Sequence, residues 1–495
     1  MQKLLSATER RRLSIIEELV KKRTWVSVED LALAARCSTK TIMTDYCLFA
    51  DSWMSYFTIE LSKNNMARIH FVKNKRMDDI YAEFLKQSPI FNFMEELFFT
   101  PRETEEYWAD KLFISESSLY RMAKLINEEM ENEVGVKLER QPLYFIGKKE
   151  RWVRNWFTQY FETVTNLYNW PFPKIDQSII LNLVIDISKR LGFHLNDEEI
   201  HHYSLAAGVC LTRAKQNFLT DEMVQEHEKE MENLLLEYQN RVQAAVDFPL
   251  PSVWQVGILR TVFHFVSGWD NQEEKEKIHD EINEFMTSLS HRARIPINEC
   301  DKFNLTEKIA TLYSQYKLFP YAKYALFNNL KFQSERVFEI YPNFSHFLFI
   351  ELKLLEKRTK FPWYSKMLSH VSNFLFSEWG DLPILLENKR VKIKILVISS
   401  LGLTHAKMVA SILNIRFQYS VNVALYEGTA FDFQSVGNEK SEYQMIVANA
   451  RIQLKEEEKL FVVDNVPSYL QLAEIAEEIA RLQLEYHLMI KSTYK

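Results

Sequence analysis

Glycine and proline are scarce in this chain of 495 residues, which has 10 of the former and 13 of the latter. Because these two residue types interrupt helices, their scarcity predicts long helices with few breaks. Cysteine is rarer still, and Cys37, Cys47, Cys210 and Cys300 show no paired spacing. This argues against the ligand pattern of a zinc module and is typical of a protein in the reducing cytoplasm.

Long hydrophobic runs and metal-binding histidine pairs are also missing. No stretch of about 18 uncharged apolar residues occurs, so we expect no membrane span. The amino-terminal residues enter a charged helix without a hydrophobic signal region. The histidines form no His-x-x-x-His or His-Glu-x-x-His pair, so we expect no metal and no cofactor.

Apolar and aromatic side chains make up 47% and 13% of the residues, the proportions of a well-packed globular protein. The length predicts about three or four domains. The net charge is −6, but residues 1–76 hold 14 Lys and Arg against 8 Asp and Glu. That segment therefore carries +6, and the other 419 residues sum to −12. A basic end on an acidic body indicates that one end meets phosphate, and the alternative is a chance excess in a short segment.

Residues 28–46 predict two short helices joined by a tight turn. In the first helix, Val28, Leu31 and Ala35 make one apolar face. In the second, which Ser38 caps, the expected buried stripe comprises Ile42, Tyr46, Phe49 and Trp53, and the expected outer face comprises Lys40, Thr41, Thr44 and Asp45. This layout is typical of a helix-turn-helix, whose second helix offers its early residues to base edges in the DNA major groove. An ordinary helical hairpin is the alternative, and Arg36 stands at the turn, where a glycine would relieve a left-handed backbone.

The flanking residues predict a winged form of this fold. Residues 9–22 supply a supporting helix, and residues 57–61 and 66–71 alternate around a polar turn as a β-hairpin does. Lys63 at the hairpin tip and Arg68 on its return strand are expected to contact backbone phosphate. Such contacts position a protein on DNA without specifying sequence.

The same pattern occurs a second time, and this repeat favours DNA binding. The expected elements are helices over 77–87 and 89–99, a helix from Pro101 to Leu112, an N-cap at Ser115, a helix over 117–130, and a hairpin of 136–140 with 142–147. Arg121 is the strongest candidate, because a guanidinium pairs with a guanine edge or grips a phosphate. A solvated helix arginine is the alternative. Residues 77–150 sum to −7, so contact there is expected to be local to Arg121, Lys124, Lys137 and Arg140.

Together the two units provide one predicted DNA-contacting set, whose members are polar or basic and lie early on a second helix or on the first hairpin. The set comprises Ser38, Lys40, Thr41, Thr44, Lys63, Arg68, Ser115, Ser117, Ser118, Arg121 and Lys124.

The rest of the chain divides into a helical region and a terminal α/β region. From about residue 151 to 385 helical patterns run without convincing strands, and a break at 296–305 divides them into two bundles. Strands are then expected over 391–399, 421–426, 443–448 and 459–463, alternating with helices over 405–414 and 467–491, which predicts a small parallel sheet. The loop Ser399–Thr404 would present backbone amides at a helix N-terminus, an anion site. It lacks the lysine and glycine spacing of a P-loop, which argues against nucleotide binding.

In this order and size of parts, the whole chain resembles the Mga/AtxA-type virulence regulators. The resemblance rests on Val28–Tyr46, on Leu112–Arg121 and on Lys394–Thr404. It implies a mainly α multidomain protein with winged helix-turn-helix units at 1–76 and 77–150, helical phosphotransferase-regulation domains at 151–295 and 296–388, and an enzyme IIB-like α/β domain at 389–495. It also implies DNA-dependent transcriptional regulation, commonly activation, tuned by histidine phosphorylation in the helical domains.

The family's regulatory residues carry over incompletely. Residues 195–213 resemble the regulation-domain helix that ends in arginine, but the usual histidine position falls on Ala206. The possible phosphorylation sites are the neighbours His201 and His202 and, by domain placement, His264, His346 and His370. IIB proteins carry phosphate on a cysteine that ends the first strand, whereas Ser399 stands at that position here. Because a serine alkoxide needs an activating base, we expect self-association or sensing from this domain rather than phosphotransfer.

These observations predict a cytoplasmic, non-enzymatic transcription activator. Its expected partners are promoter DNA, the phosphocarrier protein of the sugar phosphotransferase system, and a second copy of itself in a homodimer formed through the helical and C-terminal domains. No membrane partner is expected. Two alternatives stay open: a phosphocarrier or anion-binding enzyme that uses the C-terminal domain, and a helical scaffold whose winged units bind protein.

Overall fold

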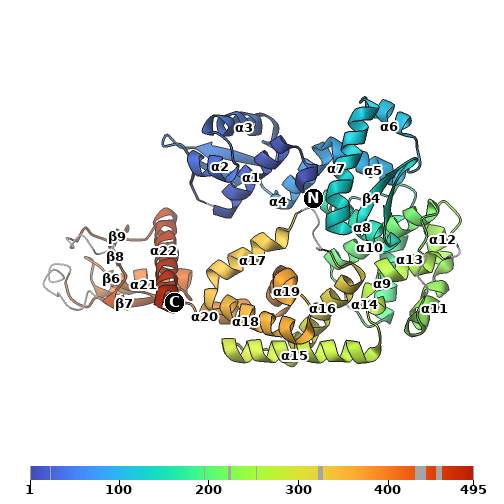
Figure 1. The fold of residues 1–495 in the computed structure, drawn as a ribbon. Helices are drawn as coiled ribbons and strands as arrows, with labels where there is room; N and C mark the ends of the chain where they lie inside the picture. Colours follow the sequence, from blue (N-terminus) through green and yellow to red (C-terminus); the bar gives the residue numbers. More distant parts are fainter. Residues whose placement is uncertain are drawn as a thin grey trace. The chain divides into compact units, whose positions relative to one another are not determined.

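The computed structural model describes residues 2–22, 24–193, 195–220, 224–251, 253–321, 327–429, 442–452 and 460–493. Helices dominate these residues, with two small antiparallel sheets and one parallel sheet, so the predicted mainly α multidomain class is confirmed (Figure 1). The chain forms two compact units. One comprises Met1–Asn283, Thr306–Ser334 and Leu355–Val371, and the other comprises Glu284–Leu305, Glu335–Leu354 and Ser372–Lys495. The division into five domains stays a prediction. Among the described residues, none of the helices has the length and apolar character needed to cross a membrane.

The first winged unit consists of α1 (Ala7–Lys22), α2 (Val28–Ala34), α3 (Thr39–Ser52) and the strands β1 (Val26–Ser27), β2 (Phe57–Leu61) and β3 (Met66–Phe71). The antiparallel strands lie in the order β1-β3-β2. The register of β2 and β3 runs from Phe57 opposite Phe71 to Leu61 opposite Ala67, so the predicted hairpin is confirmed. In the predicted apolar stripe Ile42, Phe49 and Trp53 are buried, whereas Tyr46 is partly exposed.

The second winged unit repeats this order. It consists of α4 (Met77–Gln87), α5 (Pro89–Phe99), α6 (Glu105–Lys111), α7 (Glu116–Val134) and a hairpin of β4 (Val136–Arg140) and β5 (Leu143–Gly147). The predicted helix start at Pro101 is wrong, because Thr104 caps α6 by accepting a hydrogen bond from the amide of Tyr107 at 3.1 Å. Trp108 of α6 is buried with its ring 5.3 Å from that of Phe93 in α5, which anchors the short helix.

Helices fill the middle of the chain. They are α8 (Glu150–Val164), α9 (Gln177–Arg190), α10 (Asp197–Lys215), α11 (Lys229–Glu237), α12 (Gln239–Ala245), α13 (Trp254–Thr261), α14 (His264–Ser267), α15 (Gln272–Ala293), α16 (Glu299–Leu318), α17 (Asn329–Ile340), α18 (Pro342–Thr359), α19 (Trp363–Glu378) and α20 (Leu382–Asn388). In the described part of residues 151–385, β structure is limited to one isolated bridge between Ile175 and Val246, as the sequence predicts.

Aromatic packing joins α8 to the second winged unit. Phe157 of α8 lies 4.4 Å from Phe98 of α5 and 5.2 Å from Phe145 of β5, measured between ring centroids. Phe161, one turn further along α8, lies 5.4 Å from Phe98. Since truncating one such buried ring to alanine typically costs about 3–5 kcal/mol, these contacts hold the wing and α8 as one packed body.

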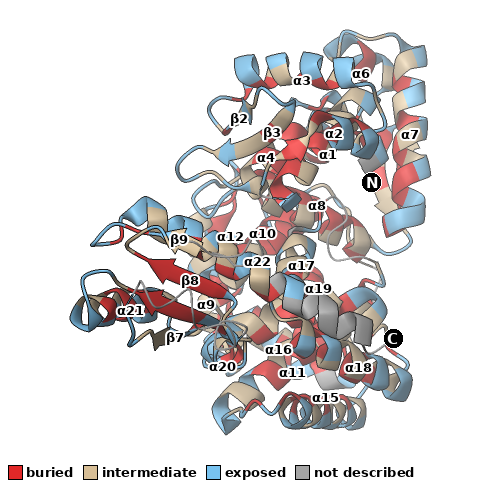
Figure 2. Cartoon of the chain, turned by 90° about the vertical axis from the view of Figure 1, so that its left-hand side faces the viewer, coloured by how far each residue is buried: buried red, intermediate tan, exposed pale blue. Residues whose placement is uncertain are grey.

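The C-terminal region is a parallel sheet with helices. Its strands β6 (Ile393–Ile398), β7 (Val421–Leu425), β8 (Met445–Ala448) and β9 (Leu460–Val462) lie in the order β7-β6-β8-β9, with α21 (Leu403–Phe417) and α22 (Tyr469–Thr493). The four predicted strands are confirmed with slightly shorter bounds, and β8 is buried along its whole length (Figure 2). Because β7 and β8 flank the first strand β6 on opposite sides, the carboxyl ends of β6 and β8 form a topological switch point.

Candidate nucleic-acid interface

A tight turn with a left-handed residue joins α2 to α3. Arg36 has a φ of 51°, in the region where glycine is favoured. The amide of Cys37 donates to the carbonyl of Ala32 at 2.9 Å and closes the end of α2. Ser38 then caps α3, its Oγ accepting from the amide of Thr41 at 3.2 Å. The turn expected from the sequence is therefore present, with an arginine where glycine would be least strained.

The second unit has the same turn 77 residues later (113 against 36, 115 against 38). Phe113 has a φ of 55°, and the amide of Ile114 donates to the carbonyl of Ala109 at 3.0 Å. Ser115 caps α7, its Oγ accepting from the amide of Ser118 at 3.2 Å. The repeat read from the sequence is thus a repeat of backbone geometry, down to the residue with positive φ.

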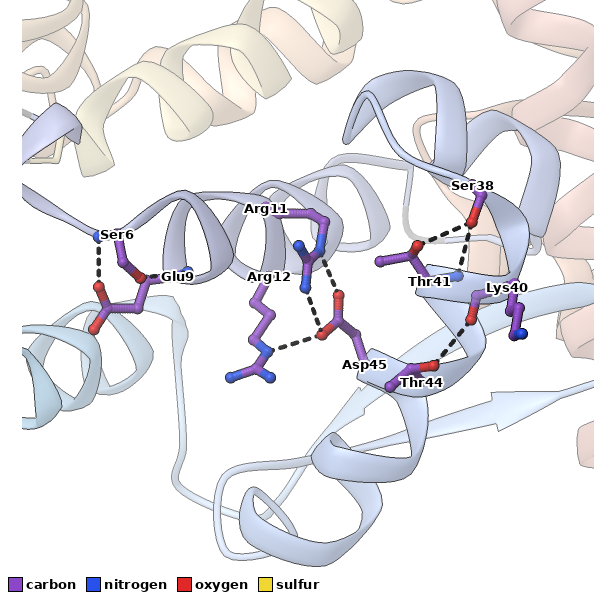
Figure 3. Close-up of polar contacts among 9 residues, drawn as sticks. All are labelled: Ser6, Glu9, Arg11, Arg12, Ser38, Lys40, Thr41, Thr44 and Asp45. Carbon is purple, nitrogen blue, oxygen red and sulfur yellow. Dashed lines mark hydrogen bonds and ion pairs between the residues drawn. The ribbon is translucent and has the colours of Figure 1, made fainter.

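Asp45 corrects one expectation about α3. The sequence places it on the outer face, but its side chain is 1% exposed and points at α1 (Figure 3). Arg11 donates to both carboxylate oxygens, at 2.8 and 3.1 Å, and Arg12 donates to one at 2.9 Å. Burial acts to raise the pKa of Asp45, but the hydrogen bonds from the two guanidinium groups outweigh it, so this pKa is lowered. Asp45 is a clamp between helices, because two cations compensate its burial.

The exposed N-terminal face of α3 is small and polar. Lys40 and Thr44 are exposed, and Thr41 is partly exposed. The Thr44 hydroxyl donates to the carbonyl of Lys40 at 3.1 Å, while the Lys40 side chain points away from Asp45 (Figure 3). No ion pair of Lys40 occurs within the described residues. Its charge is therefore available to a ligand, and Met43, 40% exposed and missed by sequence reasoning, lies on the same helix.

The first hairpin offers one available cation rather than two. Lys63 is exposed at its tip and has no ion pair within the part of the chain described. Arg68 is engaged, because its Nη2 lies 3.0 Å from Glu60 and its guanidinium lies 4.8 Å from the ring centre of Trp25. The structure thus supports a phosphate contact at Lys63 better than at Arg68.

The exposed row on α7 follows Ser115. Arg121 is exposed and donates to the carbonyl of Ser117 at 3.3 Å and to Ser118 Oγ at 3.2 Å, weak local contacts that a ligand can replace. Lys124, one turn later, lies 3.7 Å from Glu128. Four residues of the predicted DNA-contacting set therefore lie near the N-terminus of α7, namely Ser117, Ser118, Arg121 and Lys124.

Other cations of the second unit are held by carboxylates. Arg140 lies 2.8 Å from Glu105 and stacks on Tyr120 at 4.3 Å, and Lys137 pairs with Glu139. The sequence treats Lys137 and Arg140 as possible local contacts, but Lys137 is engaged within β4 and Arg140 by residues of α6 and α7. Phe113 adds a feature that sequence reasoning missed, since its side chain is 96% exposed at the turn before α7.

The five histidines predicted as phosphorylation sites differ in exposure. His201, His264 and His370 are buried. His202 of α10 lies with Nδ1 3.1 Å from Glu162 of α8, and His346 of α18 is exposed. Burial also lowers the pKa of His201. Of the five, His346 is exposed and His202 is partly exposed, so these two rings are more accessible to a phosphate donor than the three buried ones.

Arg213, at the end of α10, links the helical region to the second wing. Its Nε and Nη2 donate to Glu150 at 2.8 and 2.7 Å, and Nη2 also donates to the carbonyl of Phe145 in β5 at 3.0 Å. Arg154 shares Glu150 at 3.2 Å. The sequence flags Arg213 by resemblance but gives no signal for Glu150, which lies 63 residues away.

The predicted anion loop contains a network that sequence reasoning missed. Ser399 Oγ lies 2.8 Å from His405 Nδ1, and His405 Nε2 lies 2.5 Å from the carbonyl of Asn465. Asn449 Oδ1 accepts from the amide of Ser400 at 2.8 Å. Ser399 and Ser400 follow β6, Asn449 follows β8 and Asn465 follows β9, whereas His405 lies in the first turn of α21. Among the described residues no group of three or more His, Cys, Asp or Glu side chains is placed to hold a metal.

Comparison with known proteins agrees with this architecture. Residues 73–161, which run from just before α4 to the last turn of α8, match the Mga helix-turn-helix domain. A Streptococcus pneumoniae protein named for trans-acting regulation is 23% identical over 94% of this chain and 96% of its own length. The anthrax toxin expression trans-acting positive regulator of Bacillus anthracis is 19% identical over 90% of this chain and 93% of its own length. The capsule synthesis positive regulator AcpB of the same organism is 24% identical over 42% of this chain and 43% of its own length. Residues 73–161 thus match the Mga helix-turn-helix domain, and nearly the whole chain is similar to trans-acting regulators of the Mga/AtxA type.

Proposed function

We propose that this chain activates transcription by binding promoter DNA through both winged units. The observation that carries the proposal is the repeated turn, which twice places a capped helix with exposed polar side chains beside a hairpin. In such a geometry the early residues of the second helix enter the major groove and the wing lies near phosphate. A net positive first unit adds a sequence-independent attraction to the duplex.

The roles of the predicted residues follow from their surroundings. Arg121 is proposed to read a guanine edge, because its own contacts are weak and local. Ser117 and Lys40 flank the bases, and Lys63 grips phosphate. Ser38, Thr41, Ser115 and Ser118 cap or open their helices, and Thr44 lies one turn into α3, so their contacts to DNA are proposed as secondary.

The test is genome-wide DNA occupancy of the full chain in cells, with the variants Arg121→Ala and Lys40→Ala. Both variants should lose promoter occupancy while keeping the circular dichroism spectrum of the natural chain. Lys86→Ala is the matched control, since Lys86 is an exposed lysine of α4 outside the predicted set. Normal occupancy by Arg121→Ala and Lys40→Ala would favour the scaffold alternative.

Regulation by the sugar phosphotransferase system is part of the proposal, and the predicted site of action is the cytoplasm. Phosphate on His202 would place negative charge beside Glu162, 3.1 Å from the ring, and push α10 away from α8. Because Arg213 of α10 donates to Phe145 in β5, such a shift would reach the second wing. Incubation with the phosphocarrier protein and phosphoenolpyruvate should label His202 or His346 and spare the buried His201, His264 and His370. Occupancy that does not change in cells without the phosphotransferase system would contradict this regulation.

Self-association through the helical and C-terminal domains is also proposed. The C-terminal region exposes apolar side chains at the end of β9, on α21 and α22, and in the loops that precede these helices, namely Leu401, Leu403, Ile415, Val462, Val466, Tyr469 and Leu470. Such an accumulation is typical of a surface that another protein covers. A homodimer would also let two weak DNA contacts act together. Light scattering should give a dimer mass that Ile415→Asp lowers, and a concentration-independent monomer would contradict it.

A second candidate function is favoured by the contact of Ser399 with His405. The sequence argues against phosphotransfer here because a serine hydroxyl needs an activating base, and His405 lies where such a base would act. We still expect no label on residues 389–495 after incubation with the phosphocarrier protein, because the Ser399 hydroxyl is already held by the amide of Leu401 at 3.0 Å. Label at Ser399 that His405→Ala abolishes would establish the phosphocarrier alternative.

A further inference from the structure

A cavity of about 400 Å³ lies at the C-terminal ends of α15 and α20 and the N-terminal turn of α18. Small-molecule sites commonly span about 300–1,000 Å³. Four cationic residues line this cavity: Arg292, Arg294, Lys389 and Arg390. No acidic side chain is among its lining residues within the described chain. All of these residues belong to the second compact unit.

Two of the four cations are neutralised and two are not. Arg292 pairs with Glu351, and Arg390 lies 3.1 Å from Glu387. Lys389 donates to the carbonyl of Ala293 at 3.1 Å, which leaves its charge uncompensated. Arg294 is exposed and has no ion pair within the described residues. The cavity therefore keeps a surplus of about two positive charges at its rim.

The position of Arg294 is fixed by its backbone. It has a φ of 53°, where glycine is usual after a helix. Its amide donates to the carbonyl of His291 at 3.1 Å, and the amide of Ile295 donates to Ser290 at 2.9 Å. Arg294 therefore stands at the cavity rim in a backbone conformation that costs about 1–2 kcal/mol in a residue with a side chain.

The floor of the cavity is apolar and aromatic. Phe344 and Leu386 are buried, Phe347 is partly exposed, and Ile340 is 43% exposed. Tyr341 is held in place by donating from its hydroxyl to Glu387 at 2.6 Å. Pro342 opens α18, and the partial positive charge of this helix end is opposed by the C-terminal carbonyls of α15 and α20, so the preference for an anion rests on Arg294 and Lys389. An apolar floor below a cationic rim selects ligands that have both parts.

We propose that this cavity binds a small organic anion with an aromatic or other apolar body and a phosphate or carboxylate group. The body packs on Phe344, Phe347 and Ile340, and the anionic group meets Arg294 and Lys389. A neutral molecule of the same shape has no anionic group to meet the cations of the rim, and inorganic phosphate has no apolar part to pack on the floor. The proposal is independent of DNA binding.

The test is isothermal titration of the full chain with 1-naphthyl phosphate, 1-naphthoate, 1-naphthol and inorganic phosphate. We expect one or both of the naphthyl anions to bind, and 1-naphthol and inorganic phosphate to bind at least tenfold more weakly. The stronger of the two anions identifies the headgroup. No binding of either anion at millimolar concentration, or equal binding of 1-naphthol, would overturn the proposal.

Variants assign the binding to this cavity. Arg294→Glu with Lys389→Glu should weaken naphthyl anion binding at least tenfold, and Ile340→Asp should weaken it severalfold. Lys357→Glu is the control, since it reverses the charge of an exposed lysine at the end of α18, outside the cavity lining. Thermal melts establish that each variant folds. Unchanged affinity in the folded double variant would place the binding elsewhere and refute the site.

Discussion

The two winged units share one backbone plan but are stabilised by different means. In the first, a buried carboxylate bound by two arginines fixes α3 against α1. In the second, the position equivalent to Asp45 is Met122 (45 + 77), and an apolar face including Leu119 and Ile126 holds α7. The same turn geometry thus tolerates a polar or an apolar attachment behind the recognition helix.

The winged unit with the net positive charge is not the one that matches the Mga helix-turn-helix domain. The first unit is basic, yet the Mga helix-turn-helix domain matches residues 73–161 and so falls on the acidic second unit. In the second unit most cations are paired with carboxylates, as Arg140 is with Glu105. Arg121, near the N-terminus of α7, makes only local contacts to its own helix. We infer that the second unit contributes sequence reading and the first contributes attraction to the duplex.

Breaking the Asp45 clamp should have the largest effect. Asp45→Asn leaves two guanidinium groups facing one neutral amide, and loss of one partner of a buried ion pair costs about 3 kcal/mol or more. Urea unfolding of the full chain followed by circular dichroism should show an earlier first transition. Met122→Ala, the matched change in the second unit, should cost less, because Met122 is partly exposed.

The pH dependence of this difference gives an independent check. Because the pKa of folded Asp45 is lowered, its stabilising contribution is complete above the pKa of an aspartate in the unfolded chain. It is lost as the pH falls through the lowered pKa of the folded protein. The stability gap between the natural chain and Asp45→Asn should therefore close in acid, and a gap that stays constant would contradict the clamp.

Removing Arg213 should loosen the attachment of the second wing to α10. Arg213→Gln leaves Glu150 with Arg154 alone and the carbonyl of Phe145 without its donor, a loss of about 2–3 kcal/mol. Arg190→Gln breaks the exposed pair with Glu237 and should cost less than about 1 kcal/mol. Hydrogen exchange should show faster exchange in β4 and β5 for Arg213→Gln alone. Equal exchange in both variants would mean that Arg213 does not support the wing.

The division of labour on DNA predicts unequal losses of affinity. Arg121→Ala should weaken binding to a promoter fragment about tenfold or more and relax base preference at one position. Lys63→Ala should weaken binding to all sequences by a smaller factor and lower the salt slope by about 1. Fluorescence anisotropy at several salt concentrations measures both. A sequence-selective loss in Lys63→Ala would reverse the proposed roles of the units.

Local patterns predicted most of the fold. Alternation located both hairpins, and period and capping located α3 and α7. The position of Asp45 on its helix did not predict that its side chain is buried. A carboxylate is expected on the exposed face unless a cationic partner elsewhere in the chain is known. Arg11 and Arg12 lie 34 and 33 residues away, and nothing in the spacing links them to it.

The candidate site was predicted in its residue types but not in their availability. Arg68 and Lys124 look equivalent to Lys63 and Arg121 in sequence, yet Glu60 and Trp25 engage Arg68 and Glu128 approaches Lys124. The contacts of His405 with Ser399 and Asn465 depend on the ends of β6 and β9 lying beside the first turn of α21, which periodicity does not reveal. Contacts between side chains far apart in the sequence cannot be predicted from local patterns, and these contacts decide which cations are available.

The smallest expected effect concerns the two left-handed turn residues. Arg36→Gly and Phe113→Gly should each stabilise the chain by about 0.5 kcal/mol, because glycine relieves a positive φ but loses more entropy on folding. Arg36→Ala and Phe113→Ala are the controls, since alanine keeps the strain and removes the side chain. Thermal melts compare the four variants. If alanine stabilises as much as glycine, the positive φ is not the cause, and removal of the exposed side chain accounts for the gain in stability.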